Sequence, residues 1–520
     1  MQMNKSIKLN FKYSQFNQLD DFVNYLSPFI KDMKHVRDYE SQYAPLHLVN
    51  DTQFIQESQR VSQNLKSVDV LVVVGIGGSN LGTQAIYEAM QSSKMNELKT
   101  LLFADTTDSA MLNNLINLLK MLHDNENTIA INVISKSGTT TETLANFYVL
   151  YDALKQIEEG TFESGNDNSN STNSSSQTEN ENTKNGEDKS EETVDTSSLN
   201  NDIEDVDKSK SEDNKKEGRG EENPEEDSQN ETQESEGNND TFAKTKLALH
   251  ERIIVTTDKG SKLYIIGKQQ GFKVLTIPKH VGGRYSVFSN VGLFPLSFSG
   301  LNIEELLRGA KEIQSQCLQT KSQNPAIMSA TAMYLAKKRG QSVVNMFVFS
   351  TYLKSLGAWY RQLFAESLGK KMNSSETREV RSGMMPIVSV GSTDLHSVAQ
   401  LFLGGPNMTY HQFVTIGSSN SIEIKRVPQG FEFLLPSIFE KSVDFVMDSI
   451  YTGVERAFVK EKIPFDHFHM NEINEYSLGA FMQFKMIEVM LLAKLWSVNA
   501  FNQPSVELYK QETRKLLEEE

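Results

Sequence analysis

The sequence predicts an α/β protein with doubly wound, mainly parallel sheets. Short apolar, β-branched runs such as residues 68–74 and 129–134 alternate with segments of helical spacing, which is the pattern of parallel βαβ units. Glycine- and hydroxyl-rich turns connect these two runs to the helices that follow. The alternation resumes after an acidic tract at 161–240, so this tract is predicted to interrupt one α/β unit rather than to separate two.

The predicted elements follow one another in two groups. Residues 1–64 are expected to be helical, with Leu19, Phe22, Val23 and Leu26 on one face. Apolar runs bounded by glycine or polar residues predict strands at 68–74, 101–104, 129–134, 252–257, 272–277, 343–349 and 387–391. A helix is expected over 352–368, ending before Gly369, and another is expected to begin at Pro504.

The acidic character of the chain is concentrated in one place. Of its 68 acidic and 52 basic residues, 25 acidic and 7 basic residues fall in 161–240, so 43 and 45 remain elsewhere. The folded part is therefore nearly neutral and lacks the basic excess of a nucleic-acid-binding protein. The tract is rich in Ser, Asn, Glu and Asp. It is predicted to be disordered, because it cannot bury enough apolar surface to offset its ordering entropy.

Other features of composition favour a cytoplasmic protein without a membrane partner. No run of 18 apolar residues is present, and residues 1–16 lack the apolar core of a signal peptide. The lone Cys317 cannot form an internal disulfide and is expected to be a small buried hydrophobic residue.

The turn after residues 129–134 is the first candidate site. Its hydroxyl groups surround Gly138 and belong to Ser135, Ser137, Thr139, Thr140 and Thr141. Free N–H groups at the start of the next helix, together with these hydroxyls, would bind a phosphate. The alternative is an ordinary helix N-cap, but that needs only one hydroxyl, so a phosphate cradle is favoured.

A second glycine turn spans residues 75–82. It resembles a dinucleotide-binding fingerprint, but Asn80 stands where the third glycine should be. Asp105 follows the next strand at about the position of a ribose-binding acid, so a nucleotide is not excluded. A sugar phosphate is preferred, because a second hydroxyl-rich cradle lies at 135–141.

Further candidates lie in the second half of the chain. Arg284 follows two glycines that would let a ligand approach the backbone, although a surface ion pair explains it equally well. Gln362 and Glu366 lie four apart on one helix face, and position alone favours a solvated role for Glu366. A lone histidine such as His396 is usually structural, and a lysine such as Lys510 is usually solvated.

Several segments together resemble the glucose-6-phosphate isomerase (phosphoglucose isomerase) family. They are residues 75–79, 135–140, 282–286, 359–369, 391–396 and 501–510, so the resemblance covers about 65–515 without the tract. Removing 161–240 from 520 residues leaves 440, similar to the compact bacterial-type enzyme. Ser505 stands where the family usually has glycine, and residues 40–50 also depart from its pattern.

The resemblance implies two tandem SIS (sugar isomerase) domains, each a three-layer αβα sandwich with a mainly parallel sheet. It also implies a homodimer with active sites at the subunit contact. The predicted organisation is a helical segment 1–64, a first SIS domain in two parts (65–160 and 241–285) around the insertion 161–240, a second SIS domain 286–500 and a closing helix 501–520.

The resemblance also implies a role for each site residue. The phosphate would be held by Ser79, Ser135, Ser137 and Thr140, with Gly78 and Lys136 alongside. Glu366 would be the base, Arg284 would stabilise the enediolate, and Gln362 would contact the sugar. His396, contributed across the dimer, would open the ring with help from Lys510 and Gln503. Moving a proton between C1 and C2 needs an acid–base group and a cation but no redox cofactor, and no metal-ligand constellation is evident.

Two alternatives remain open from the sequence. A non-catalytic SIS-domain sensor of sugar phosphates would keep the 135–140 cradle without needing Glu366, His396 and Lys510 together. An isomerase that also accepts mannose 6-phosphate would differ only in details of the pocket.

Overall fold

The computed structural model describes residues 2–3, 6–11, 19–162, 247–417, 421–426, 430–431 and 433–519. The tract predicted to be a disordered insertion, 161–240, lies outside the described residues from position 163 onward. All of the described residues belong to one compact unit, which comprises residues 1–162 and 244–520.

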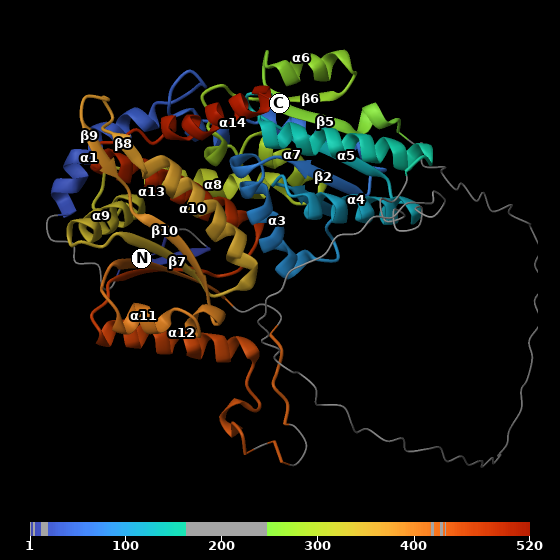
Figure 1. Cartoon of the computed structure of the whole chain (residues 1–520). Coiled ribbons are helices and arrows are strands. Elements are labelled where there is room, and N and C mark those ends of the chain that lie inside the picture. Colours follow the sequence, from blue (N-terminus) through green and yellow to red (C-terminus); the bar gives the residue numbers. More distant parts are fainter. Residues whose placement is uncertain are drawn as a thin grey trace, which may run out of the picture. The chain divides into compact units, whose positions relative to one another are not determined.

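The first sheet has five parallel strands in the order β3-β2-β4-β5-β6 (Figure 1). They are β2 (Val70–Val74), β3 (Thr100–Ala104), β4 (Ile129–Ile134), β5 (Ile253–Asp258) and β6 (Lys273–Ile277). β4 and β5 flank the acidic tract in sequence, yet they are neighbours, with Ile131 opposite Ile253. The chain before and after the tract therefore forms one sheet, as the continuous alternation predicts.

The second sheet has the order β1-β12-β11-β7-β10. Its members are β1 (Ile7–Asn10), β7 (Val343–Val348), β10 (Met385–Val390), β11 (Thr409–Ile416) and β12 (Phe465–Met470). The last four are parallel, whereas β1 adds antiparallel to β12 with Ile7 opposite Met470. The prediction that residues 1–64 are helical is wrong at β1. Its alternation of buried Ile7 and Leu9 with exposed neighbours is too short to reveal a strand.

Helices cover both faces of each sheet. Their bounds are α1 (Leu19–Lys34), α2 (Gln53–Asn64), α3 (Leu81–Lys94), α4 (Ser109–Asp124), α5 (Thr141–Glu159), α6 (Lys262–Gln269), α7 (Asn290–Phe298), α8 (Ile303–Cys317), α9 (Pro325–Lys338), α10 (Lys354–Leu368), α11 (Ala399–Gly404), α12 (Val443–Lys460), α13 (Glu475–Leu495) and α14 (Glu507–Glu519). A hairpin of β8 (Lys370–Met372) and β9 (Glu379–Ser382) follows α10.

Alternating side chains of the strands enter separate hydrophobic cores. In β2, Val70, Val72 and Val74 pack with side chains of α4 and α5, whereas Leu71 and Val73 join the core that contains α3 and α7. In the second sheet, aromatic side chains pack with α11 and α12, and the opposite face contacts the core of α9, α10 and α13 (Figure 1). Each sheet is thus the middle layer of an αβα sandwich, and the predicted fold class is confirmed.

The structure also bears on two smaller expectations, which concern Cys317 and membrane-spanning helices. Cys317 is fully buried on α8, and burial raises the pKa of its thiol, so it behaves as a small hydrophobic residue. None of the helices in the described part of the chain is both long enough and apolar enough to cross a membrane.

Candidate active site

A cavity of about 630 Å³ opens beside the carboxyl ends of the first sheet's strands, where ligands bind in open α/β sheets. It is also lined by α10 and by the C-terminal segment. Ten of the predicted site residues line it: Gly78, Ser79, Lys136, Ser137, Thr140, Arg284, Gln362, Glu366, Gln503 and Lys510. The fold thus gathers segments that lie hundreds of residues apart in sequence.

The hydroxyl-rich turn lies between β4 and α5. Gly138 has φ +68°, a conformation that side-chain-bearing residues rarely adopt. Thr140 occupies the N-cap position of α5, but its hydroxyl makes no capping bond to the helix backbone. The ordinary N-cap explanation therefore does not account for Thr140, which lines the cavity.

Ser135 is placed differently from its predicted role. Its side chain is buried and does not line the cavity. Its hydroxyl lies 2.9 Å from the Thr140 hydroxyl and accepts a 3.1 Å hydrogen bond from the Gly138 N–H. Ser135 therefore holds the turn and contacts Thr140. Its predicted contact with the phosphate stays a prediction.

The second glycine turn, η3 (Gly77–Ser79), packs against η5 (Gly283–Tyr285). A Cβ atom on Gly78 would lie 2.2 Å from the Gly283 carbonyl carbon, so only glycine allows this approach. Beside it, Asn80 is buried and donates a 3.1 Å hydrogen bond to Asp105. Asn80, which stands where the dinucleotide fingerprint needs glycine, is thus hydrogen-bonded to Asp105, the acid at the position of a ribose-binding residue.

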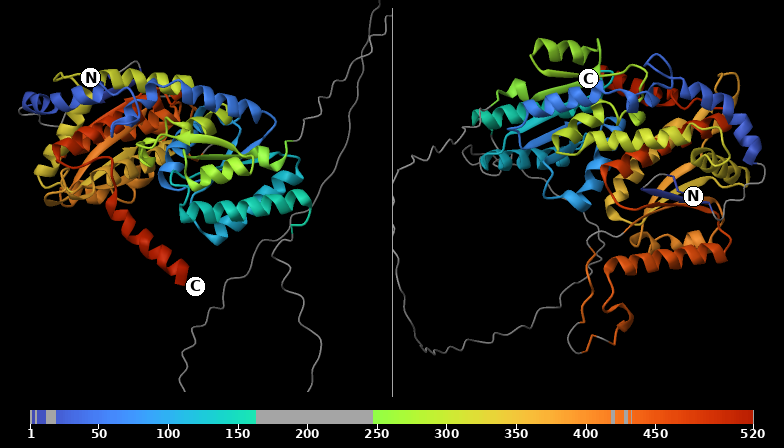
Figure 2. Two further views of the ribbon diagram at one scale, coloured as in Figure 1. Left: turned by 90° about the horizontal axis from the view of Figure 1, so that it is seen from above. Right: turned by 180° about the vertical axis from the view of Figure 1, so that it is seen from behind.

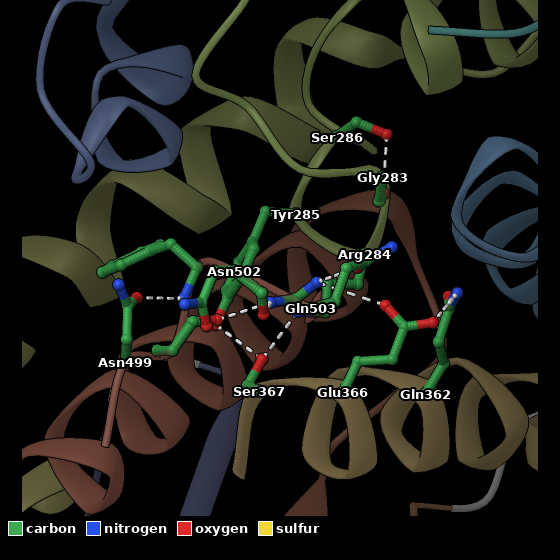
Figure 3. Close-up of polar contacts among 12 residues, drawn as sticks. Gly283, Arg284, Tyr285, Ser286, Gln362, Glu366, Ser367, Asn499, Asn502 and Gln503 are labelled. Atoms are coloured by element: carbon green, nitrogen blue, oxygen red, sulfur yellow. Dashed lines mark hydrogen bonds and ion pairs between the residues drawn. The ribbon is translucent and has the colours of Figure 1, made fainter. Parts of the chain in front are cut away.

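The guanidinium of Arg284 is the centre of the polar network (Figure 3). Arg284 is buried, and every nitrogen of its guanidinium donates hydrogen bonds. The acceptors are Ser367 Oγ (2.8 Å), Glu366 Oε2 (3.2 Å), Gln503 Oε1 (2.6 Å), and the carbonyls of Ala500 (2.6 Å) and Asn502 (3.2 Å). Arg284 is therefore tied to both α10 and the C-terminal segment, and the surface ion-pair alternative is excluded.

Glu366 and Gln362 project from the same face of α10 toward Arg284 (Figure 3). The Gln362 amide donates a 3.0 Å hydrogen bond to Glu366 Oε1, so both carboxylate oxygens have a polar partner. The Glu366 side chain is 27% exposed. The Gln362 carbonyl oxygen is buried without a hydrogen-bond partner among the described residues.

The cavity carries more positive charge than the sequence indicated. Lys279, which follows β6 closely, joins Lys136, Arg284 and Lys510 in the lining, opposite Asp258 and Glu142. Burial lowers the pKa of Lys136, and the nearby Asp258 opposes this shift. Lys279 was not predicted, although its place just after a parallel strand could have indicated it.

Two predicted residues belong to other parts of the chain: Lys510 to the C-terminal helix, and His396 to the turn that follows a strand of the second sheet. Lys510 forms a 3.1 Å ion pair with Glu507 in the first turn of α14. His396 follows the turn after β10, is exposed, and does not line this cavity. Its predicted action across a dimer stays a prediction.

A family model described as phosphoglucose isomerase matches residues 32–184 and 232–520. The chain belongs to the phosphoglucose isomerase family. A probable glucose-6-phosphate isomerase of Methanococcus maripaludis is 25% identical over 497 residues, covering 95% of this chain and 88% of that protein. The glucose-6-phosphate isomerase of Acholeplasma laidlawii is 26% identical over 501 residues, covering 96% and 95%.

Two solved structures share the fold of this chain. A hypothetical protein from Thermus thermophilus superposes with a TM-score of 0.72 at 24% identity, covering 98% of this chain and 99% of that one. A glucose-6-phosphate isomerase from Chlamydia trachomatis superposes with a TM-score of 0.69 at 17% identity, covering 98% and 88%. At these identities the likeness concerns the fold.

Proposed function

We propose that this chain is an aldose–ketose isomerase that interconverts glucose 6-phosphate and fructose 6-phosphate through an enediolate. The observation that carries the proposal is the contact of Glu366 with both Arg284 (3.2 Å) and Gln362 (3.0 Å) inside a cavity that also holds the hydroxyl-rich turn. A base, a cation and a phosphate cradle in one cavity are what this reaction requires.

The phosphate would bind at the η3 and Ser137–Thr140 side of the cavity. The hydroxyls of Ser79, Ser137 and Thr140 supply donors there, and Lys136 supplies positive charge. Binding the phosphate at this end fixes the orientation of the sugar chain relative to α10. The two reacting carbons are then presented to Glu366 at the other side.

The chemical step needs only groups that the cavity already holds. The Glu366 carboxylate takes the C2 proton of the open-chain aldose, and the electrons of that C–H bond form the C1=C2 bond of the enediolate. The Arg284 guanidinium stabilises the negative oxygen. Glu366 then returns the proton to C1 while the proton of the C2 hydroxyl moves to the C1 oxygen, which leaves a carbonyl at C2. The product is therefore an isomer, and no oxidant or reductant is consumed.

We also propose that the protein acts as a homodimer in which His396 of each subunit reaches the site of the other. Large apolar side chains are exposed on the segment between β11 and α12: Ile422, Phe431, Phe433, Leu434 and Leu435. The described residues of this segment extend beyond α12 (Figure 1). Large apolar side chains that are exposed together on one segment are typical of a protein interface.

Turnover of fructose 6-phosphate, followed by coupling glucose 6-phosphate to its dehydrogenase, tests the proposal. We expect isomerisation at an ordinary enzymatic rate, on the order of 1–10³ s⁻¹, with mannose 6-phosphate assayed in parallel to define substrate breadth. A protein that binds fructose 6-phosphate without converting it would instead be a sensor of sugar phosphates.

A further inference from the structure

Lys370 lies directly beyond the helix that carries Glu366. Its ammonium group donates a 2.6 Å hydrogen bond to the carbonyl oxygen of Glu366 and a second hydrogen bond to the carbonyl oxygen of Asn502. The residue is only 7% exposed. A carbonyl in the last turn of a helix lacks an intrahelical partner, so Lys370 both caps α10 and connects it to the C-terminal segment.

The connected segment, residues 499–503, is called the strap here. It is held by two cations, because Arg284 also donates to Asn502, to Ala500 and to the Gln503 side chain. The ring of Phe501 packs between Tyr43 and Tyr285, with centroids 5.5 and 5.8 Å away. The strap thus positions Gln503 at the cavity and leads directly into η9 (Pro504–Val506) and α14.

The C-terminal end of the strap has less packing support than Ala500 and Phe501, because Gln503 is exposed. A second cavity, of about 500 Å³, lies beside the strap and is lined by Lys370, Asn499, Asn502 and Leu508. Glu366, Gln503 and Val506 line both this cavity and the candidate active site, so they form the wall between the two. Beyond the strap, η9 and α14 contain no buried residue, and α14 extends away from the rest of the fold (Figure 2). The hydrogen bonds of the strap therefore contribute to holding this wall in place.

We propose that Lys370 is a positioning residue for isomerisation, which fastens the strap to the last turn of α10 and so fixes Gln503 and Lys510 relative to Glu366 and Arg284. The proposal rests on the proposed function, because it assigns these four residues to one reaction. Lys370 reaches the two carbonyls and does not line the candidate active site, so it acts through the strap and not on the sugar.

The charge of Lys370 gives the contact a pH dependence. Burial lowers its pKa from 10.5 to about 7; the neighbouring Arg284 adds to this shift, and Glu366 opposes it. Lys371 and Glu376 are the other charged groups along the second cavity, and both are exposed. Release of the strap would expose this amine and return its pKa toward 10.5, so a rising pH between about 7 and 10.5 favours the fastened strap over the released one.

Stability should respond to pH in the same direction as the strap contact. Between pH 7 and 10.5 the unfolded chain binds more protons at this lysine than the folded chain does. The contribution of Lys370 to the free energy of unfolding therefore increases with pH in this window. A variant with no titratable group at this position should lack this increase.

Lys370→Met tests the proposal against the adjacent Lys371→Met, since Lys371 is exposed and has no part in the strap. We expect Lys370→Met to lower kcat by about 10- to 100-fold, the effect of misplacing a catalytic group by roughly 1 Å. KM for fructose 6-phosphate should change less than about threefold, because the proposed phosphate cradle does not contact the strap. Amide hydrogen exchange should accelerate over residues 500–510 in Lys370→Met only.

Lys370→Arg keeps the positive charge and supplies a second test if the methionine variant folds poorly. It should retain most of the parental kcat and should lose the pH dependence of the strap contact above pH 7, because arginine does not titrate there. Parental kcat and parental exchange in Lys370→Met would overturn the proposal, as would a pH profile of Lys370→Arg identical to that of the parent. If the parent itself does not isomerise fructose 6-phosphate, the proposed function fails, while hydrogen exchange still reports whether Lys370 holds the strap.

Discussion

Gly78→Ala should damage the site through one added methyl group. The new Cβ would lie 2.2 Å from the Gly283 carbonyl carbon and 2.5 Å from the Arg284 nitrogen, both of them backbone atoms that cannot rotate away. Ordinary contacts begin near 3.4 Å, so η3 and η5 must separate by roughly 1 Å. Such overpacking costs about 1–3 kcal/mol of stability. A shift of this size between Ser79 and Arg284 should lower kcat/KM by about 10²-fold.

The matched control for this variant is Gly453→Ala in α12. There the added Cβ meets no atom within 4 Å, and replacing a helical glycine by alanine should stabilise the protein by about 0.5–1 kcal/mol. Thermal unfolding and the coupled fructose 6-phosphate assay measure both effects. If Gly78→Ala keeps the parental Tm and kcat/KM, then the close approach of η3 and η5 does not shape the site.

Three further predictions concern the cradle, the insertion and the dimer. Thr140→Val should weaken fructose 6-phosphate binding by about 1–3 kcal/mol in calorimetry and leave the weak binding of unphosphorylated fructose unchanged; equal losses for both sugars would contradict a phosphate contact. Joining residue 160 to 241 should leave Tm and turnover nearly unchanged, since β4 and β5 already pair, whereas a folded but inactive product would show a catalytic role for the tract. Mixing His396→Ala with Glu366→Gln should restore some activity once subunits exchange, and exchange without recovery would place His396 in its own subunit's site.

The sequence alone was sufficient to predict a strand or a site residue wherever the local pattern of residues matches their role in the fold. The strands β2 and β4 of the first sheet are uniformly buried runs rich in apolar residues, so their positions could be predicted from composition alone. The hydroxyls around Gly138 were informative because a helix start needs only one of them. Glu366 was different: its helical position favoured a solvated side chain, and only the family resemblance indicated the base.

The features that the sequence did not reveal depend on contacts between distant segments. β1 is a four-residue strand that exists because β12 offers it an edge. The contact of the Ser135 hydroxyl with the Thr140 hydroxyl could not be read from the sequence either. Lys370 has no local pattern of its own, and its importance arises from a carbonyl 132 positions away in the chain. Such pairings require the fold to be known.

The measurement that tests the central claim most directly is isomerisation by Glu366→Gln in deuterated water. Glutamine preserves the shape and can still contact Gln362, but it cannot accept the proton. We predict that fructose 6-phosphate binding survives, that kcat falls by at least about 10²–10⁴-fold, and that exchange of the C1/C2 hydrogen with solvent stops. The exposed Glu379, paired with Arg381 on the hairpin, supplies the control Glu379→Gln, which should behave as the parent does. Parental turnover and parental exchange in Glu366→Gln would show that the base lies elsewhere.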